Sequence, residues 1–189
     1  DYVFFDSGFF VLLLRFFKNI NVQKLSGYKF LDFYFDYLKI NKKKIFSIDP
    51  NKELSNSYRL FFKKKIKIKS FHYIAPKYNL RIKINKNLIK RIHDSKAKEI
   101  IINIGGGTQE ILGYYLSKKL NKKYKIVCTG AAIAFFTGDQ SPINNNIDKL
   151  YLGWFFRIIY NPKIFLPRYL SAFKLFFLFI RKKNTISLH

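Results

Sequence analysis

The stretch "EIIINIGGGTQEILGYYLSKKL", residues 99–120, joins a run of isoleucines to three consecutive glycines and then to a segment with helical spacing. An apolar run that ends in glycine and opens a helix is typical of a strand, turn and helix in an α/β protein. The N–H groups at such a helix start can bind a phosphate group. Alternatively, the glycines only supply the backbone angles of a tight turn.

The same alternation continues along the chain on both sides of this stretch. Short β-branched runs alternate with segments at helical spacing. The runs lie at 43–48, 65–71, 99–104 and 123–130, and the helical segments at 52–62, 85–96 and 108–120. This rhythm predicts an α/β fold with a Rossmann-like, mostly parallel sheet and helices on both faces. Ligands of such sheets bind beyond the carboxyl ends of the strands, so we expect the loops after Ile48, Ile104 and Cys128 to line the site.

The character of the sequence changes near Gly138, beyond which prolines separate short helical pieces with aromatic and basic residues. We therefore predict an α/β core over residues 1–137 and a C-terminal helical appendage over residues 138–189. The apolar run 175–180 is too short to span a bilayer, for which a helix needs roughly 20 apolar residues. Its phenylalanines and flanking basic residues fit an amphipathic helix in a membrane interface, and packing against the sheet explains the same periodicity.

The composition favours a polyanionic partner. The 189 residues include 36 Lys and Arg but only 11 Asp and Glu, a formal net charge of +25. Such a charge attracts nucleic acid, an anionic membrane surface or a phosphate-bearing substrate. The single cysteine excludes a disulfide framework within the chain and fits a reducing, cytosolic setting. The sequence starts inside an apolar run and contains no methionine, so we expect the core to be N-terminally incomplete.

The three glycines match neither of the two familiar nucleotide-binding spacings. The dinucleotide motif needs a glycine at the sixth position, where Glu110 stands, and the P-loop needs a Gly-Lys-Ser/Thr ending. The turn can still seat a diphosphate, with Gln109 donating from its amide to a ligand oxygen. The sequence has no HExxH motif and no Asp-x-Asp pair, so we expect no metal and no cofactor. Backbone amides, Arg and Lys would then meet the charge of a leaving diphosphate.

Three further residues are candidates for chemistry. Asp6, in "FFDSGFF", stands out because carboxylates are scarce in this chain. At the end of an apolar strand it is well placed to act as a general base, or it is the N-cap of the next helix. We expect His72 to be a hydrogen-bonding loop residue and Cys128 to be a small buried residue, neither of them a catalyst.

Three motifs, in order and spacing, resemble the WecG/TagA/CpsF family of bacterial glycosyltransferases. They are "IINIGGGTQEILGYYL", "CTGAAIAFFTG" and "LYLGWFFRIIYNPKIFLPRYL". The upstream stretches "DYVFFDSGFF" and "KLSGYKFLDFYF" are similar to the family as well, so the resemblance covers most of the chain.

The resemblance implies an inverting, metal-independent enzyme. Members transfer N-acetylmannosamine or its uronic acid from a UDP-sugar to a lipid diphosphate-linked N-acetylglucosamine, and a related hexose is an open alternative for this chain. The expected partners are therefore a UDP-sugar donor, a lipid diphosphate-linked acceptor and an anionic membrane surface, with no nucleic acid. We expect a cytoplasmic protein, peripheral at the inner face of the bacterial plasma membrane, that serves cell-surface polysaccharide synthesis. Whether the protein forms a homo-oligomer is left open.

The resemblance assigns roles to the residues of this chain that stand at functional positions of the family's motifs. Asp6 falls on the family's proposed catalytic base, and Gln109 falls on the glutamine of the sugar-nucleotide pocket. Arg157 and Arg168 fall on arginines that would contact the diphosphate. The expected substrate-binding set is completed by the residues of the turn, Gly105, Gly106, Gly107 and Thr108.

Some positions depart from the family pattern. Ala134 and Gly153 stand where an aspartate and a glutamate are common, Lys29 stands where an aspartate is common, and "GDQSP" is a shortened segment. These departures leave open an inactive relative that acts as a scaffold. Another alternative is a basic nucleic-acid-binding protein, which the charge and the frequent Lys-aromatic neighbours favour. The sequence has no RRM, KH or helix-turn-helix signature to support it.

Overall fold

The computed structural model describes residues 4–78 and 86–139 and, in the C-terminal segment, residues 158–159, 162–163, 166–167, 170–171, 174 and 176–177. The chain divides into two compact units. The larger unit is Gly27–Gln140, and the smaller unit combines Asp1–Ser26 with Ser141–His189. The predicted division into residues 1–137 and 138–189 stays a prediction.

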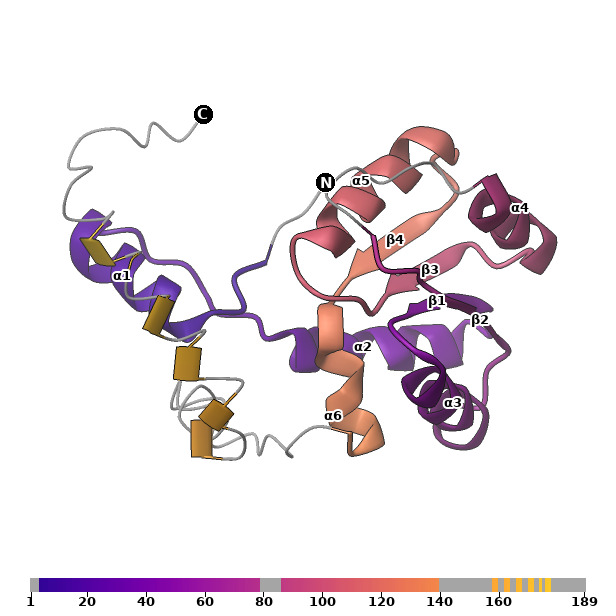
Figure 1. The fold of residues 1–189 in the computed structure, drawn as a ribbon, viewed down its shortest axis with the longest axis horizontal. Coiled ribbons are helices and arrows are strands. Elements are labelled where there is room, and N and C mark those ends of the chain that lie inside the picture. The colour runs from indigo at the N-terminus through magenta and orange to yellow at the C-terminus, as the bar shows by residue number, and fades with distance from the viewer. Residues whose placement is uncertain are drawn as a thin grey trace. The chain divides into compact units, whose positions relative to one another are not determined.

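The larger unit is built on a parallel sheet (Figure 1). Its strands are β1 (Ile45–Asp49), β2 (Ser70–Ile74), β3 (Glu99–Ile102) and β4 (Lys125–Cys128), in the order β2-β1-β3-β4. Its helices are α2 (Gly27–Ile40), α3 (Lys52–Phe61), the π-helix η1 (Phe62–Ile66), α4 (Lys86–Ser95), α5 (Thr108–Lys119), the 3-10 helix η2 (Gly130–Ile133) and α6 (Ala134–Thr137). All three strand pairs are parallel, which confirms the predicted α/β fold.

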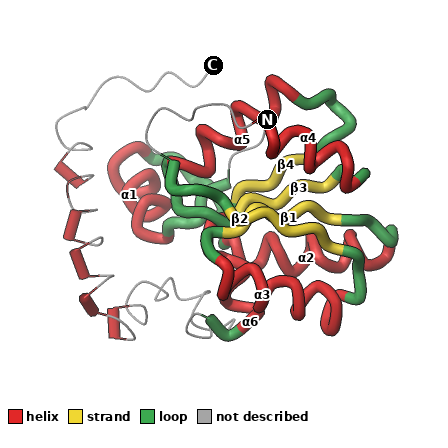
Figure 2. The backbone as a smooth tube through the Cα atoms, turned by 45° about the vertical axis from the view of Figure 1, so that its right-hand side comes forward, coloured by secondary structure: helices red, strands yellow, loops and turns green. Residues whose placement is uncertain are grey.

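Helices cover both faces of the sheet, as Figure 2 shows. Side chains alternate along a strand, so Phe46 and Ile48 of β1 lie on one face and Ile45 lies on the other. The first face packs against α4 and α5 through residues such as Leu88 and Leu112. The second packs against α2, α3 and η2. Each fully buried Leu or Ile side chain stabilises this packing by about 1.5–3 kcal/mol, which explains why the central strands are apolar on both faces.

All four predicted strands are found with shifted or shorter bounds, and one prediction is wrong in part. The run 65–71 was predicted to be a strand, but its first residues belong to η1, and β2 begins only at Ser70. Lys67 ends η1 in the left-handed conformation, with φ of 60°. The alternating Lys and Ile of this run fit a strand. They also fit a helical turn that exposes lysines and places Ile66 and Ile68 against the core.

The strand order creates a switch point between β1 and β3. From β1 the chain crosses to β2 on one side, and it then returns to β3 on the other side of β1. The connection after β1 leads to β2, and the connection after β3 leads to β4 on the opposite side. These two connections therefore diverge above the carboxyl ends of β1 and β3. Ligands of open α/β sheets bind at such a place. We call the side of the sheet where the four strands end its carboxyl edge.

The smaller unit contains α1 (Gly8–Lys18). Ser7 is the N-cap of α1, because its hydroxyl accepts a hydrogen bond of 3.2 Å from the backbone N–H of Phe10. The alternative that Asp6 caps this helix is therefore wrong. Residues 4–7 form no strand, so a strand directly before Asp6 is not found among the described residues. No helix in the described part of the chain is long and apolar enough to cross a membrane.

Gly113 is required by the packing of α5 on β4. A Cβ added to Gly113 would lie 2.7 Å from the sulfur of Cys128. We expect Gly113→Ala to lower the free energy of unfolding by about 1–3 kcal/mol, measured by urea denaturation, because the clash outweighs the better helix propensity of alanine. In a Cys128→Ala background the sulfur is gone, and the same change should become neutral or stabilising. Equal losses in the two backgrounds would rule out this contact as the cause.

A polar network and a glycine turn at the carboxyl edge

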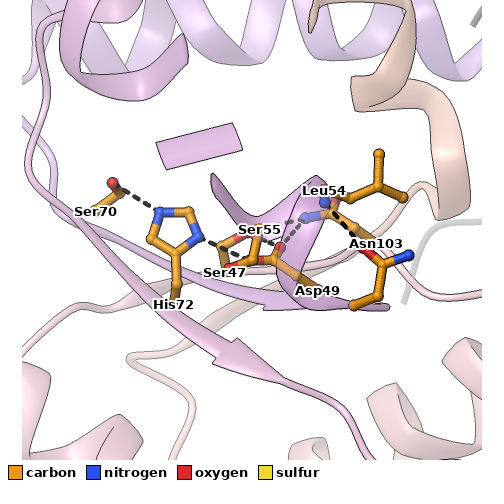
Figure 3. A network of polar contacts seen from close by, with 8 residues as sticks. Ser47, Asp49, Leu54, Ser55, Ser70, His72 and Asn103 are labelled. Atoms are coloured by element: carbon orange, nitrogen blue, oxygen red, sulfur yellow. Dashed lines mark hydrogen bonds and ion pairs between the residues drawn. The ribbon is translucent and has the colours of Figure 1, made fainter. Parts of the chain in front are cut away.

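Asp49 ends β1 and is fully buried, at 0% exposure. Its carboxylate accepts four hydrogen bonds (Figure 3). Oδ1 accepts from the Ser47 hydroxyl at 2.6 Å and from Nδ2 of Asn103 at 3.0 Å. Oδ2 accepts from the Ser55 hydroxyl at 2.8 Å and from Nδ1 of His72 at 2.7 Å. A buried carboxylate is tolerated only with such partners, so these contacts are the reason that Asp49 can lie in the core.

His72 lies in β2 and is not the loop residue that the sequence predicted. Its side chain is 1% exposed. Nδ1 faces Asp49, and Nε2 lies 2.9 Å from the hydroxyl of Ser70, two residues earlier on the same side of the strand. The carboxylate fixes Nδ1 as the protonated nitrogen, because only an N–H can approach it at that distance favourably. His72 thus ties the edge strand β2 to β1.

Asn103 is the first residue after β3 and is 2% exposed. Its backbone N–H donates to the carbonyl of Ile48 at 2.9 Å, which extends the pairing of β3 with β1 by one residue. Its side-chain Nδ2 donates to Asp49 and, at 2.9 Å, to the hydroxyl of Ser47. Its carbonyl Oδ1 is buried and has no hydrogen-bond partner in the described part of the chain. Sequence reasoning missed this network, although polar residues inside or directly after apolar strands, Ser47, Asp49 and Asn103, were a signal for it.

The glycine turn, residues 105–107, follows two residues later and is exposed. A Cβ added at any of its three positions would meet no atom of the described residues within 4 Å. Only Gly107 has a positive φ, of 84°, so the turn geometry requires glycine at that position alone. The described residues give no steric reason for Gly105 and Gly106, and they leave room for a ligand to approach the backbone there.

The residues after the turn are bonded to one another. Gln109 is 8% exposed, and its Oε1 accepts from the backbone N–H of Gly130 at 2.6 Å. Its Nε2 donates to Glu110 at 2.8 Å, and the other oxygen of Glu110 accepts from the N–H of Gly107 at 2.5 Å. Gln109 therefore joins the start of α5 to the loop after β4, and Glu110 caps α5.

A comparison with models of protein families shows to which family the chain belongs. Residues 1–187 match the family model described as the glycosyl transferase WecG/TagA/CpsF family. The chain belongs to this family. The resemblance seen in the three motifs is thereby confirmed, and the activity of the family is glycosyl transfer. No curated protein matches the chain.

The structure brings some of the predicted site residues of this family member together. Thr108 and Gln109 begin α5 directly after the glycine turn, so this part of the predicted set lies at the carboxyl edge, beside Asn103. Asp6 belongs to the smaller unit, where it is exposed and precedes the N-cap of α1. Arg157 and Arg168 lie outside the described residues, as does Gly153. Ala134, the other departure from the family pattern, is 2% exposed at the start of α6.

Cys128 ends β4 and is exposed, so the prediction that it is buried is wrong. Its sulfur nevertheless lies against α5, 3.6 Å from the carbonyl oxygen of Gln109. This partial burial, with a smaller contribution from the charge of Glu110, raises the pKa of the Cys128 thiol to about 11. Because the thiolate is the nucleophilic form, little of it is present near neutral pH. Among the described residues, no group of three or more His, Cys, Asp or Glu could hold a metal ion.

Proposed function

We propose that the chain is an inverting, metal-independent glycosyltransferase that moves a sugar from a UDP-sugar to a lipid diphosphate-linked acceptor. The observation that carries this proposal is the position of the glycine turn. It lies at the start of α5 and beside the switch point of the sheet, in a chain that its family model matches over residues 1–187. The proposed donor carries N-acetylmannosamine, its uronic acid or a related hexose, and the product serves cell-surface polysaccharide synthesis.

The donor diphosphate is proposed to bind at the glycine turn. A helix of 12 residues such as α5 favours an anion at its start, where the aligned peptide dipoles act as roughly half a positive charge. The Glu110 carboxylate already occupies the N–H of Gly107, so the diphosphate would approach Gly105 and Gly106. Arg157 and Arg168 are proposed to supply the balancing positive charge in place of a cofactor or a metal.

The proposed reaction is a single in-line displacement. Asp6 accepts the proton of an acceptor hydroxyl, and the hydroxyl oxygen forms a bond to the anomeric carbon of the donor sugar. The bond from that carbon to the diphosphate oxygen breaks, and UDP leaves with the electron pair. Backbone amides and arginines stabilise the negative charge that develops on the diphosphate. One displacement inverts the anomeric carbon.

Transfer itself tests the proposal. The full chain is incubated with labelled UDP-sugars and a lipid diphosphate-linked N-acetylglucosamine, with and without EDTA. We expect labelled lipid and free UDP in equal amounts, with no effect of the chelator. Binding of UDP without transfer from any donor would favour the scaffold alternative. Transfer that EDTA abolishes would contradict the metal-independent mechanism.

We further propose that the smaller unit binds the anionic inner face of the plasma membrane, so that the protein is peripheral and cytoplasmic. Several of its large apolar side chains are exposed, among them Phe16 at 79%, Leu170 at 60% and Phe177 at 64%. Helix α1 has no acidic residue in its first turn and carries Arg15 and Lys18 in its last turn. Inserted aromatic rings beside basic side chains are typical of helices that lie in a membrane interface.

Vesicle flotation tests the membrane proposal with two matched substitutions. Phe16→Ser removes an exposed ring of the smaller unit, and Phe33→Ser removes one of similar exposure, 63%, from α2 of the larger unit. We expect the unchanged chain to float with vesicles containing anionic lipid, and to do so less at high salt. Phe16→Ser should float several-fold less and Phe33→Ser should float normally. Equal binding to neutral vesicles, or equal loss in both variants, would contradict the proposal.

A further inference from the structure

We propose that Asn103 and Thr129 bind hydroxyl groups of a sugar next to the diphosphate of the donor, and that Asp49 is the positioning residue that fixes the Asn103 amide. This inference rests on the proposed function and names a contact within the same site. Asn103 supplies a carbonyl oxygen as acceptor, and Thr129 supplies a hydroxyl. The sugar is the ribose of the nucleotide or the hexose that is transferred, since both are linked directly to the diphosphate.

The two side chains occupy neighbouring positions along the carboxyl edge. The last paired residues of the three strands are in register, Ile48 with Ile102 and Ile102 with Cys128. Continuing this register by one residue places Asp49, Asn103 and Thr129 in a row across the ends of β1, β3 and β4. We call these three residues the polar row.

Two members of the polar row keep an unpaired polar atom. Oδ1 of Asn103 and the hydroxyl of Thr129 are both buried, and neither has a hydrogen-bond partner among the residues that the structure describes. An unpaired buried polar group costs about 1–3 kcal/mol, so such groups in native proteins usually meet water or a ligand. The Tyr58 hydroxyl of α3 is buried and unpaired as well, and burial followed by the charge of Asp49 raises its pKa. Asn103 and Tyr58 thus both interact with Asp49 while keeping such a group.

The direction of the Asn103 amide is fixed by its partners. A carboxylate oxygen only accepts hydrogen bonds, so the atom of Asn103 that faces Asp49 is the donor Nδ2. The Ser47 hydroxyl donates to Asp49, and its oxygen is therefore available to accept from the same Nδ2. A flipped amide would place its carbonyl oxygen against the carboxylate. Oδ1 is consequently held as an acceptor, and a sugar hydroxyl is a donor that suits it.

The spacing along the chain connects the polar row to the diphosphate. Asn103 lies two residues before Gly105, which limits their separation along the chain to about 7 Å. In a sugar nucleotide each sugar is attached directly to the diphosphate, whereas the base is one group further away. A sugar hydroxyl is therefore the donor group that fits the position of the polar row.

The test uses Thr129→Val, because valine keeps the shape of threonine and removes only the unpaired hydroxyl. Thr129→Ser is the conservative variant that restores it, and Thr137→Val makes the same exchange in α6, where the hydroxyl already has partners in Ala134 and Asp139. Dissociation constants of UDP, 2′-deoxy-UDP and a UDP-hexose are measured by calorimetry. We expect Thr129→Val to bind about 3- to 10-fold more weakly, as the loss of one neutral hydrogen bond predicts. Thr129→Ser and Thr137→Val should bind normally.

The ligands distinguish the two sugars. If Thr129→Val binds UDP more weakly than the unchanged chain does, but the two chains bind 2′-deoxy-UDP equally, the contact is with the ribose. Normal binding of UDP with weaker binding of the UDP-hexose assigns it to the transferred sugar. Unchanged affinities for all three ligands would overturn the inference and leave water as the partner of these atoms. If the unchanged chain binds neither UDP nor UDP-hexose, the proposed function itself fails.

Asn103→Ala gives a second, independent measurement. This substitution should weaken binding of the same ligand that Thr129→Val binds more weakly. In the Asp49 network it removes only the Nδ2 donor. Circular dichroism shows whether the variant is folded, and only a folded variant is titrated. A folded Asn103→Ala chain with normal affinity for every ligand would also overturn the inference.

Discussion

Replacing Asp49 with alanine is expected to lower the free energy of unfolding by about 3–5 kcal/mol, because it leaves several buried hydrogen-bond donors without their acceptor. The substitution leaves the donors of Ser47, Ser55, His72 and Asn103 without their acceptor in the core. These donors come from β1, β2, α3 and the end of β3, so one carboxylate holds four segments together. The loss should therefore exceed that of an ordinary core substitution.

Urea denaturation measures this loss, and Asp94 provides the control. Asp94 is an exposed aspartate of α4, and the same exchange to alanine at an exposed position usually changes stability by less than about 0.5 kcal/mol. We expect Asp94→Ala to unfold at nearly the same urea concentration as the unchanged chain. If Asp49→Ala also unfolds at the urea concentration of the unchanged chain, the buried network does not stabilise the fold.

Asp6→Asn is expected to lower turnover by roughly 100- to 10,000-fold, the usual contribution of a positioned general base. The amide has nearly the size of the carboxylate but cannot take the proton of the acceptor hydroxyl. Binding of UDP should be nearly unchanged, because the nucleotide is proposed to bind at the glycine turn of the larger unit. Initial rates of sugar transfer and calorimetric titration with UDP separate the two effects.

Asp36→Asn makes the same chemical change at an exposed position of α2 and serves as the control. It should retain full turnover and normal UDP binding. An Asp6→Asn enzyme with full activity would show that the base assignment is wrong. Loss of turnover together with loss of UDP binding would give Asp6 a structural role instead.

The sequence predicted the fold well where the local pattern is unambiguous. The three isoleucines of the run "EIIINI", residues 100–102, are apolar on both faces, as expected for a central parallel strand, and they form most of β3. Prediction failed at 65–71, where alternating Lys and Ile fit a strand and an exposed helical turn equally well. Ile66 at the end of the short π-helix and Ile68 after it pack on the core, and packing is not part of a local pattern.

The candidate site was only partly predictable. The glycine turn could be located because a strand end, a turn and a helix start follow one another within one short stretch. The network around Asp49 could not, because its members lie far apart in the sequence: His72 is 23 residues from Asp49 and Asn103 is 54 residues from it. Their contacts depend on strand order and register. Without knowledge of the strand order and register, the stretch "SIDPN", residues 47–51, suggests only a turn, and the surroundings of His72 suggest a loop.

A nitrogen-15 NMR titration of the full chain with UDP tests most directly that the carboxyl edge is the nucleotide site. We predict saturable shifts of the backbone amide signals of Gly105 and Gly106 and of the side-chain amide of Asn103. The amide of Lys125, at the opposite end of β4, should keep its position. Absence of saturable shifts at the glycine turn, or shifts there with a short RNA but not with UDP, would contradict the account.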